Sequence, residues 1–291
     1  MEQINGVVII DKDINMTSFD VVRKVKNILN CKKVGHTGTL DPMATGVLPI
    51  CIGKATKAVN YLIKDEKEYI AEVKLGEITD TYDREGTIID KKEILFTESE
   101  LAEAINSFKG TILQKPPNYS ALKINGKRMY DLARAGIDFE VKVREVNIFN
   151  IEIVNISMPM FTIKVKCSKG TYIRSLAYDI GEKLNCGAHL YNLRRINSGQ
   201  FNINNAVKLD ELNSISLKEN LISIEDLFSD LNSISLNAYF KNLFVNGVCI
   251  KDLRLISILN EEGIFKVYDE EKNFLGIGKR EKDFFKKESS F

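Results

Sequence analysis

Apolar residues form short runs and alternating stretches along the first two hundred positions, and these patterns predict strands. Residues 6–12 and 47–52 are rich in consecutive apolar side chains, which is typical of strands buried on both faces. Residues 68–75 alternate apolar and polar side chains, as a strand with one exposed face does. Further strands are predicted at 141–155, at 161–167 and near 189–196.

Helical spacing of apolar residues appears between these strands. Residues 17–20 have the form of a capping box, which predicts the start of a helix that runs to about residue 30. The apolar stripe of this helix is expected at Phe19, Val22, Val25 and Leu29. Other helices are predicted at 97–108, at 127–135 and from residue 171. Hairpins mixed with inserted helices indicate an α+β class and not the regular alternation of a doubly wound fold.

The pattern changes after about residue 208. Residues 208–230 are helical in pattern, acidic and rich in Ser, Asn and Leu, and we interpret them as the end of a large domain and a joint. Strand character is expected to resume from about 237, with a hairpin of 263–268 and 274–278. The Lys- and Glu-rich residues after 279 are expected to contribute little to the fold. The predicted domains are therefore 1–232 and a small β-rich module at 237–291.

Composition places the chain among soluble globular proteins. Hydrophobic residues make up 44% and charged residues 28% of 291 positions, and the longest apolar runs are strand-sized, so no membrane span is expected. No signal peptide is apparent at the N-terminus. The five cysteines are scattered without CxxC spacing and only two histidines occur. These features predict a cytoplasmic protein with neither a disulfide framework nor a metal site.

The net charge of +1 does not by itself indicate a nucleic-acid binder, but the basic residues are clustered. One cluster lies at 23–33, a second at 123–134, and Arg194-Arg195 form a third. Each cluster alone is typical of a solvated surface. Together they flank the candidate site loops, which favours a polyanionic partner.

The loop at residues 35–49 is the strongest candidate for a functional site. It contains three glycines and two prolines, and Pro42 disfavours a helical backbone at Asp41 immediately before it. Such a loop is suited to holding one carboxylate in place. The alternative is a tight turn in which Asp41 bonds nearby backbone N–H groups. Gly35-His-Thr-Gly also resembles an HxGH nucleotidyltransferase signature, but the second His is absent and Pro42 disfavours the required helix.

Asp41 is expected to be ionised at neutral pH, so it can act as a nucleophile without a general base. No acid lies near it in the chain as a glycosidase pair requires, and a cation is the natural partner for a lone carboxylate. Arg174 is the best candidate. It is predicted in the first turn of a helix capped by Thr171, where the helix dipole disfavours a cation unless an anion is close. An exposed Arg174 over an apolar surface is the alternative.

Three aromatic or heteroaromatic residues complete this hypothesis. Tyr69 on a predicted strand and Tyr172 beside Arg174 could line a pocket that stacks on a planar base extruded from a nucleic acid. His36 could stack on or hydrogen-bond to such a nucleotide. Each is also compatible with a purely structural role, and His189 in an apolar stretch is expected to be structural.

Several motifs together resemble one family. Residues 35–49 are similar to the active-site signature of the TruB family, the tRNA pseudouridine-55 synthases, and the similarity continues in family order over most of residues 6–200. The further matching segments are Gly53–Lys57, Pro116–Lys123, Gly126–Tyr130, Gly170–Arg174 and Gly187–Arg195. Residues 237–291 faintly resemble the PUA-like RNA-binding module of bacterial members. The resemblance implies the pseudouridine synthase fold, with a mixed, mainly antiparallel sheet flanked by helices and loops.

The resemblance also implies residue roles. Asp41 becomes the nucleophile, Arg174 its salt-bridge partner, Tyr69 a catalytic and base-contacting residue, and Tyr172 a second contact to the base. Leu193 becomes an apolar wall beside the base, and His36 helps to hold the target nucleotide out of its loop. One segment departs from the family, which has Lys-Pro-x-Gly where this chain has Lys12-Asp-Ile-Asn15. The turn there must form differently, and Lys12 receives no assigned role.

The implied activity is the isomerisation of uridine-55 in the T-loop of tRNA to pseudouridine. The glycosidic bond breaks, the uracil turns and is rejoined through carbon, so no cofactor and no metal are expected. Asp41 could add to the base or take a proton from the sugar. The expected partner is the T-stem-loop of tRNA, bound by a cytoplasmic monomer. The alternative function is a non-catalytic RNA-binding or tRNA-folding protein that uses the same surface.

Overall fold

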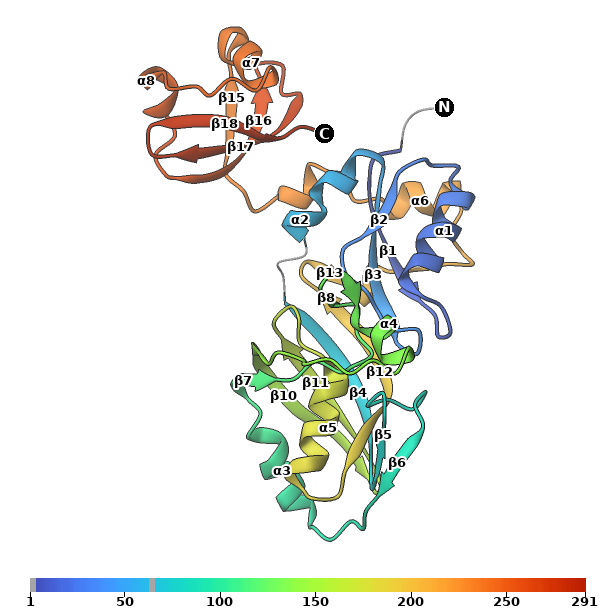
Figure 1. The fold of residues 1–291 in the computed structure, drawn as a ribbon. Helices are drawn as coiled ribbons and strands as arrows, with labels where there is room; N and C mark the ends of the chain where they lie inside the picture. The colour runs from blue at the N-terminus through green and yellow to red at the C-terminus, as the bar shows by residue number, and fades with distance from the viewer. Residues whose placement is uncertain (1–3, 63–65) are drawn as a thin grey trace.

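A computed structural model describes residues 4–62 and 66–291, and its largest feature within these residues is a ten-stranded mixed sheet (Figure 1). Its strand order is β14-β1-β3-β12-β4-β11-β10-β7, with β2 added to β3 and β13 to β12. The strands are β1 Gly6–Lys12, β2 Val34–His36, β3 Thr45–Ile52, β4 Lys67–Leu75, β7 Gly110–Gln114, β10 Arg144–Ser157, β11 Met160–Cys167, β12 Ala188–Ser198, β13 Phe201–Asn202 and β14 Val207–Lys208. All the strands predicted in the first two hundred residues are confirmed.

Most neighbours in this sheet run antiparallel, and the pairs β1–β14 and β3–β12 are parallel. The apolar run of β1 has a direct structural reason. Val8 and Ile10 belong to the main core, whereas Val7 and Ile9 belong to a second apolar cluster on the other face. The long helices α3 Glu98–Asn106 and α5 Ile173–Lys183 pack on the sheet and contact each other. The predicted α+β class is confirmed.

Helix α1 spans Ser18–Ile28 and begins with the predicted capping box between Thr17 and Asp20. The prediction for Phe19 is wrong, because its side chain is 68% exposed. The buried face of the helix instead carries Ser18, Val21, Val22 and Val25. Since successive residues of a helix are about 100° apart, Phe19 points away from the face that Ser18 buries.

The remaining short elements surround the sheet. Helix α4 begins at Met129 and not at 127, because Lys127 and Arg128 pair with the preceding strand. A polar loop joins two short strands, β5 and β6, that form an antiparallel pair. These elements are β5 Glu77–Thr79, β6 Ile88–Lys91, β8 Lys123–Ile124, β9 Lys127–Arg128, α4 Met129–Arg134, the 3₁₀ turns Gly53–Ala58, Ile203–Asn205 and Asp226–Phe228, α2 Val59–Leu62 and α6 Ser214–Asn220.

The C-terminal residues form a four-stranded sheet with its own apolar cluster, in the order β15-β16-β17-β18. The predicted hairpin is present as β16 Gly263–Asp269 and β17 Phe274–Glu281. Two expectations are wrong. Residues after Asn237 form the helices α7 Ala238–Val245 and α8 Leu253–Ile256, and the tail forms β18 Phe284–Ser289. Strand β15, Ser233–Leu236, precedes the expected module start at 237.

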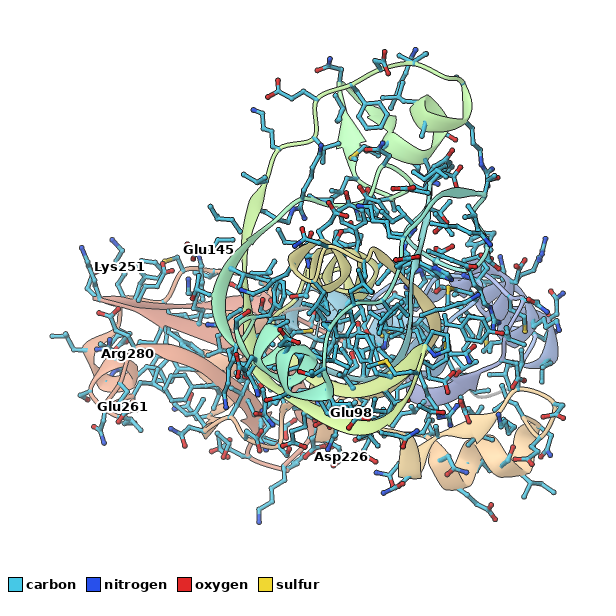
Figure 2. All side chains as sticks on the ribbon, turned by 90° about the horizontal axis from the view of Figure 1, so that it is seen from below. Glu98, Glu145, Asp226, Lys251, Glu261 and Arg280 are labelled. Carbon is cyan, nitrogen blue, oxygen red and sulfur yellow. The ribbon has the colours of Figure 1, made fainter. Side chains whose placement is uncertain are left out.

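This C-terminal unit lies to one side of the large sheet in Figure 1, and Figure 2 places the charged residues Lys251, Glu261 and Arg280 on it. Aromatic residues join the two parts. The ring of the C-terminal Phe291 stacks on Phe228 at a centroid distance of 5.7 Å and on Phe274 at 6.2 Å. Lys57 Nζ donates to the carbonyl oxygen of Ser290 at 2.8 Å. Among the described residues, no helix is long and apolar enough to cross a membrane.

Candidate active site

A cavity of about 290 Å³ opens where the loop after β2 meets β4, β12 and the start of α5. Five of the six predicted site residues line it, and they come from four separate segments of the chain: Asp41, Tyr69, Tyr172, Arg174 and Leu193. The sheet register brings two of these segments together, because Leu193 of β12 pairs with Ala71 of β4 and Arg195 pairs with Tyr69. The cavity is therefore formed by tertiary structure around the Asp41 loop.

Asp41 and Arg174 form an ion pair in this cavity. Arg174 Nε lies 2.9 Å from Asp41 Oδ2, and the side chain of Arg174 is 6% exposed whereas that of Asp41 is 36% exposed. Nε makes no aligned hydrogen bond within the described residues, so the contact is chiefly electrostatic. Arg174 occupies the first turn of α5, as predicted. The predicted cap is wrong, because Tyr172 occupies the N-cap position and the Thr171 hydroxyl donates to Ser168 O.

Arg174 has a second acidic partner that sequence reasoning missed. Its Nη1 lies 3.3 Å from Asp83 Oδ2, and Nη2 donates to the carbonyl oxygen of Tyr119 at 3.0 Å. Asp83 is buried, and its Oδ1 accepts a hydrogen bond from the hydroxyl of Thr81 at 2.7 Å. A buried guanidinium between two carboxylates and a carbonyl is held in one orientation. Asp83 therefore supports the geometry of the Asp41–Arg174 pair.

No local pattern distinguishes Asp83 from its neighbour Asp80. Asp80 Oδ1 accepts a hydrogen bond from the backbone N–H of Thr87, which is an ordinary turn contact. Asp83 differs because its backbone bridges to Leu190 of β12, which places its side chain over α5. Only the tertiary fold identifies it.

Arg195 is 1% exposed and holds the Asp41 loop through hydrogen bonds to its backbone. Its Nε donates to the carbonyl oxygen of Val47 at 2.7 Å, and its two Nη atoms donate to the carbonyl oxygens of Thr39 and Gly38. Arg194 forms a bidentate pair with Asp11, at 3.0 and 2.9 Å. Both arginines of the third basic cluster therefore have partners within the protein, although the side chain of Arg194 stays 40% exposed.

Lys12 also holds this loop, although its motif departs from the family pattern. Its side chain is fully buried, and Nζ donates to the carbonyl oxygens of Met16 at 2.7 Å and Pro42 at 3.3 Å. Burial lowers the pKa of Lys12 to about 8, while the charge of Asp41 acts in the opposite direction. Asn15 adopts a positive φ of 64°, and its N–H also donates to Pro42 O at 2.9 Å. Asn tolerates this conformation better than most residues, so it can replace a glycine in the turn.

Tyr69 and Leu193 form an apolar wall of the cavity, and both are buried. Burial raises the pKa of the Tyr69 phenol, while the positive charge of Arg195 acts in the opposite direction. Tyr69 is therefore a neutral phenol at physiological pH, suited to stacking on a base and to donating a hydrogen bond.

Tyr172 is positioned by a residue that sequence reasoning missed. The backbone N–H of Tyr172 donates to Gln114 Oε1 at 2.8 Å, and Gln114 Nε2 donates to Tyr172 O at 3.0 Å. Gln114 is fully buried at the end of β7. These two bonds fix the backbone at the start of α5, next to Arg174.

His36 differs from its expected setting. It belongs to β2, where it pairs with Ile50, and it precedes the residues of its loop that line the cavity. Its Nδ1 is buried without a hydrogen-bond partner among the described residues, and burial lowers its pKa. His189 is buried, and its Nδ1 lies 3.1 Å from the carbonyl oxygen of Glu77, as expected of a structural histidine. Residues 4–62 and 66–291 contain no group of three or more side chains arranged to hold a metal ion.

Family models match most of the chain. Residues 26–173 match the model described as the N-terminal domain of TruB family pseudouridylate synthase. Residues 174–233 match the model described as the C-terminal domain of tRNA pseudouridylate synthase B.

Curated relatives are similar over nearly their whole length. The chain is 51% identical to tRNA pseudouridine synthase B of Clostridium acetobutylicum over 282 residues, which cover 97% of this chain and 98% of the relative. It is 50% identical to the protein of the same name from Clostridium tetani, with the same coverage.

A solved structure has a similar fold. The crystal structure of a Cbf5-Nop10-Gar1 complex contains a chain that matches with a TM-score of 0.70 and 25% identity, over 94% of this chain and 78% of that chain.

Proposed function

The chain belongs to the TruB family of pseudouridylate synthases, and we propose that it isomerises uridine-55 in the T-loop of tRNA to pseudouridine, with Asp41 as the nucleophile. It has the pseudouridine synthase fold and is a tRNA pseudouridine synthase, an isomerase. The observation that carries the proposal for the site is the Asp41–Arg174 ion pair at 2.9 Å inside a cavity lined by Tyr69, Tyr172 and Leu193.

The reaction requires a nucleotide that has left its base stack. A uridine inside a folded RNA loop cannot place its glycosidic bond against Asp41, so the base must be flipped into the cavity. Tyr69 stacks on the uracil, Leu193 closes the apolar side, and Tyr172 contacts the base from the start of α5. His36 lies one residue before the cavity-lining stretch, where it can contact the RNA strand from which the nucleotide is extruded.

Asp41 acts in its ionised form. Arg174 faces Oδ2, and no hydrogen bond from the described residues reaches Oδ1, which can meet the substrate. The carboxylate either adds to the uracil ring or accepts a proton from the ribose after the glycosidic bond breaks. In both routes the C1′–N1 bond is exchanged for a C1′–C5 bond, and the proton lost from C5 is balanced by one gained at N1. The balance needs no external oxidant, reductant or group donor, so we propose no cofactor and no metal.

RNA is the partner that the relatives' names and the site chemistry support, and we propose the T-stem-loop as its recognised part. Residues 1–232 would form the catalytic domain and residues 237–291 a PUA-like module that binds RNA. We further propose that the protein acts as a monomer in the cytoplasm. The five free thiols fit a reducing compartment.

The test uses an unmodified tRNA transcript and the variant Asp41→Asn. Wild-type protein should produce pseudouridine at position 55, detected by mass spectrometry of nuclease fragments, and a transcript with cytidine at 55 should remain unmodified. Asp41→Asn should abolish turnover while its affinity for tRNA stays within a few-fold, because the substitution keeps shape and removes the charge. A wild-type protein that binds tRNA without forming pseudouridine would establish the non-catalytic alternative. A variant that keeps more than about a tenth of the rate would reject Asp41 as nucleophile.

A further inference from the structure

Arg144 lies at the rim of the active-site cavity, and its side chain has no partner in the part of the chain that the structure describes. Within residues 4–62 and 66–291, the guanidinium makes no side-chain hydrogen bond, ion pair or ring contact, and its buried Nε has no acceptor. Arg280 on the C-terminal sheet is in the same situation. The residue as a whole is only partly buried, so the rest of the guanidinium can be reached from solvent. A buried N–H without an acceptor is costly, which indicates that the acceptor arrives with a ligand.

The position of Arg144 is fixed by the sheet. It is the first residue of β10 and pairs with Gln114 of β7, the residue that clamps the backbone of Tyr172. A Cβ placed on Gly170, which lines the cavity, would lie 3.9 Å from Arg144 Nη1. Burial raises the pKa of Tyr172, and the charge of Arg144 is among the groups that act in the opposite direction, as expected for a cation close to the phenol. Arg144 therefore lies just outside the cavity wall formed by Gly170 and Tyr172.

The neighbouring acid does not neutralise it. Glu145 follows Arg144 on β10, and successive side chains of a strand point to opposite faces of the sheet. Glu145 is exposed and lies at the periphery of the large sheet in Figure 2. The positive charge at Arg144 is consequently left for an anion that approaches from the cavity side.

The two arginines inside the cavity cannot take this role. Arg174 is held by Asp41, Asp83 and a carbonyl oxygen, and Arg195 donates to three carbonyl oxygens beneath the loop. A flipped nucleotide nevertheless brings its own phosphates to the mouth of the cavity. A guanidinium is the side chain best suited to grip a phosphate through two N–H groups. Lys169 is exposed, lines the cavity next to Gly170 and adds a second positive charge on the same side.

We propose that Arg144 binds a backbone phosphate of the substrate RNA adjacent to the flipped uridine, and that Lys169 assists it. The inference rests on the proposed function, since it requires an RNA strand entering this cavity. Arg144 holds the strand in register and takes no part in bond exchange. Its removal should therefore weaken binding and leave the bound-state rate nearly unchanged.

The first experiment measures the affinity of Arg144→Gln for an unmodified tRNA transcript over a range of salt concentrations. The dissociation constant should rise about tenfold, and the slope of its salt dependence should fall by about 0.7 to 0.9, the value for one phosphate contact. The single-turnover rate at saturating enzyme should stay within about threefold of wild type. Lys109→Gln is the matched control, because Lys109 is exposed beside the opposite end of the same β7–β10 pair. Equal affinities and slopes for the two variants would overturn the proposal.

A second experiment identifies the phosphate and excludes a structural role. Methylphosphonate linkages, which are uncharged, are introduced one at a time into the loop of a synthetic T-stem-loop. At one position, the methylphosphonate should weaken RNA binding by wild-type protein and have no effect on RNA binding by Arg144→Gln. If the methylphosphonate at every position weakens binding by the variant as much as binding by wild type, the contact is rejected. The melting temperature of Arg144→Gln should equal or exceed that of wild type, because no protein contact is lost. A wild-type protein that forms no pseudouridine would reject the proposed function, and that outcome is separate from a failure at Arg144.

Discussion

Arg174 shows how an unfavourable position for one residue can be turned to use. A cation in the first turn of a helix is disfavoured by the helix dipole by a few tenths to about 1 kcal/mol, and burial adds a larger desolvation cost. Two carboxylates offset these costs, Asp41 at Nε and Asp83 at Nη1 of the guanidinium. The ion pair orients the carboxylate of Asp41 without transferring a proton to it. A nucleophilic carboxylate requires both a fixed orientation and a free negative charge.

Asp83 is therefore expected to matter for the rate although it does not line the cavity. Asp83→Asn keeps the shape of the side chain but removes one of the two negative charges that contact Arg174. Arg174 should therefore shift, and Asp41 should lose its alignment. We expect kcat to fall at least about tenfold, with a smaller change in KM. Asp80→Asn, in the same loop, is the control and should stay near wild type. Equal rates for the two variants would make Asp83 a purely structural residue.

Lys12 gives a pH dependence whose sign can be worked out. The pKa of Lys12 is about 8 in the folded protein, whereas the ordinary value of 10.5 applies to the unfolded chain. Between pH 8 and pH 10.5 the unfolded chain therefore binds a proton that the folded protein lacks. The contribution of Lys12 to stability should accordingly rise with pH from about 8 to about 10.5, by at most about 1.4 kcal/mol per pH unit. The measurement is the free energy of unfolding in urea for wild type minus that for Lys12→Met. A difference that stays flat between pH 7.5 and 10 would contradict the lowered pKa.

At the scale of elements, the site depends on how strands β3 and β12 approach each other. They pair in parallel at Arg195 and Gly46, and Gly46 has a φ of 100°. A Cβ at residue 46 would lie 2.1 Å from the carbonyl oxygen of Arg195. This glycine lets the strand that follows the Asp41 loop lie against the strand that carries Leu193 and Arg195.

Gly46→Ala should therefore destabilise the protein by more than about 3 kcal/mol, because a positive φ and a backbone clash act together. Gly136→Ala is the matched comparison, since Gly136 also has a positive φ of 65° but a Cβ there would meet nothing within 4 Å. We expect a loss of about 1 kcal/mol at Gly136, measured by urea unfolding. Similar losses of stability at both positions would show that the close approach of β3 and β12 does not determine the cost of Gly46→Ala.

The helices and strands were predicted well where their pattern is local. The capping box of α1, the alternation of β4 and the hairpin of β16 and β17 all follow from short-range rules. Errors arose where neighbours in space decide the outcome. Phe19 fits a helical stripe but points to solvent, and the tail after residue 279 forms β18 because the edge of β17 offers backbone partners.

At the scale of the whole molecule, two basic clusters are the better candidates for RNA contact, because in the third Arg194 is paired with Asp11 and Arg195 is buried. Residues 23–33 and 123–134 keep most of their lysine and arginine side chains exposed. Affinity for tRNA should fall steeply with salt as phosphate contacts release counterions, by about 10³-fold or more between 50 and 200 mM if at least six contacts form. A flat salt response in a filter-binding assay would argue against both clusters as RNA surface.

The C-terminal residue joins the two parts of the molecule, and this contact should influence how a full tRNA is bound. Deleting Phe291 removes its stacking on Phe228 and Phe274. We expect KM for full-length tRNA to rise several-fold, while KM for an isolated T-stem-loop changes little, because only the larger substrate spans both parts. The measurement is the ratio of KM for full-length tRNA to KM for the T-stem-loop, compared between wild type and the protein that lacks Phe291. An unchanged ratio would mean that the module is positioned by other contacts.

The sequence by itself determined the elements, the rigid loop around Asp41 and the family to which these motifs belong, because glycine and proline geometry and residue spacing act over short distances. Tertiary structure alone decided which side chains became partners. Asp83, Gln114 and Arg195 reach the site from segments remote in the chain, and Lys12 supports a turn in which Asn15 stands where the family has glycine. Burial and charge compensation depend on three-dimensional neighbours, so these roles could not be predicted from the pattern of residues along the chain.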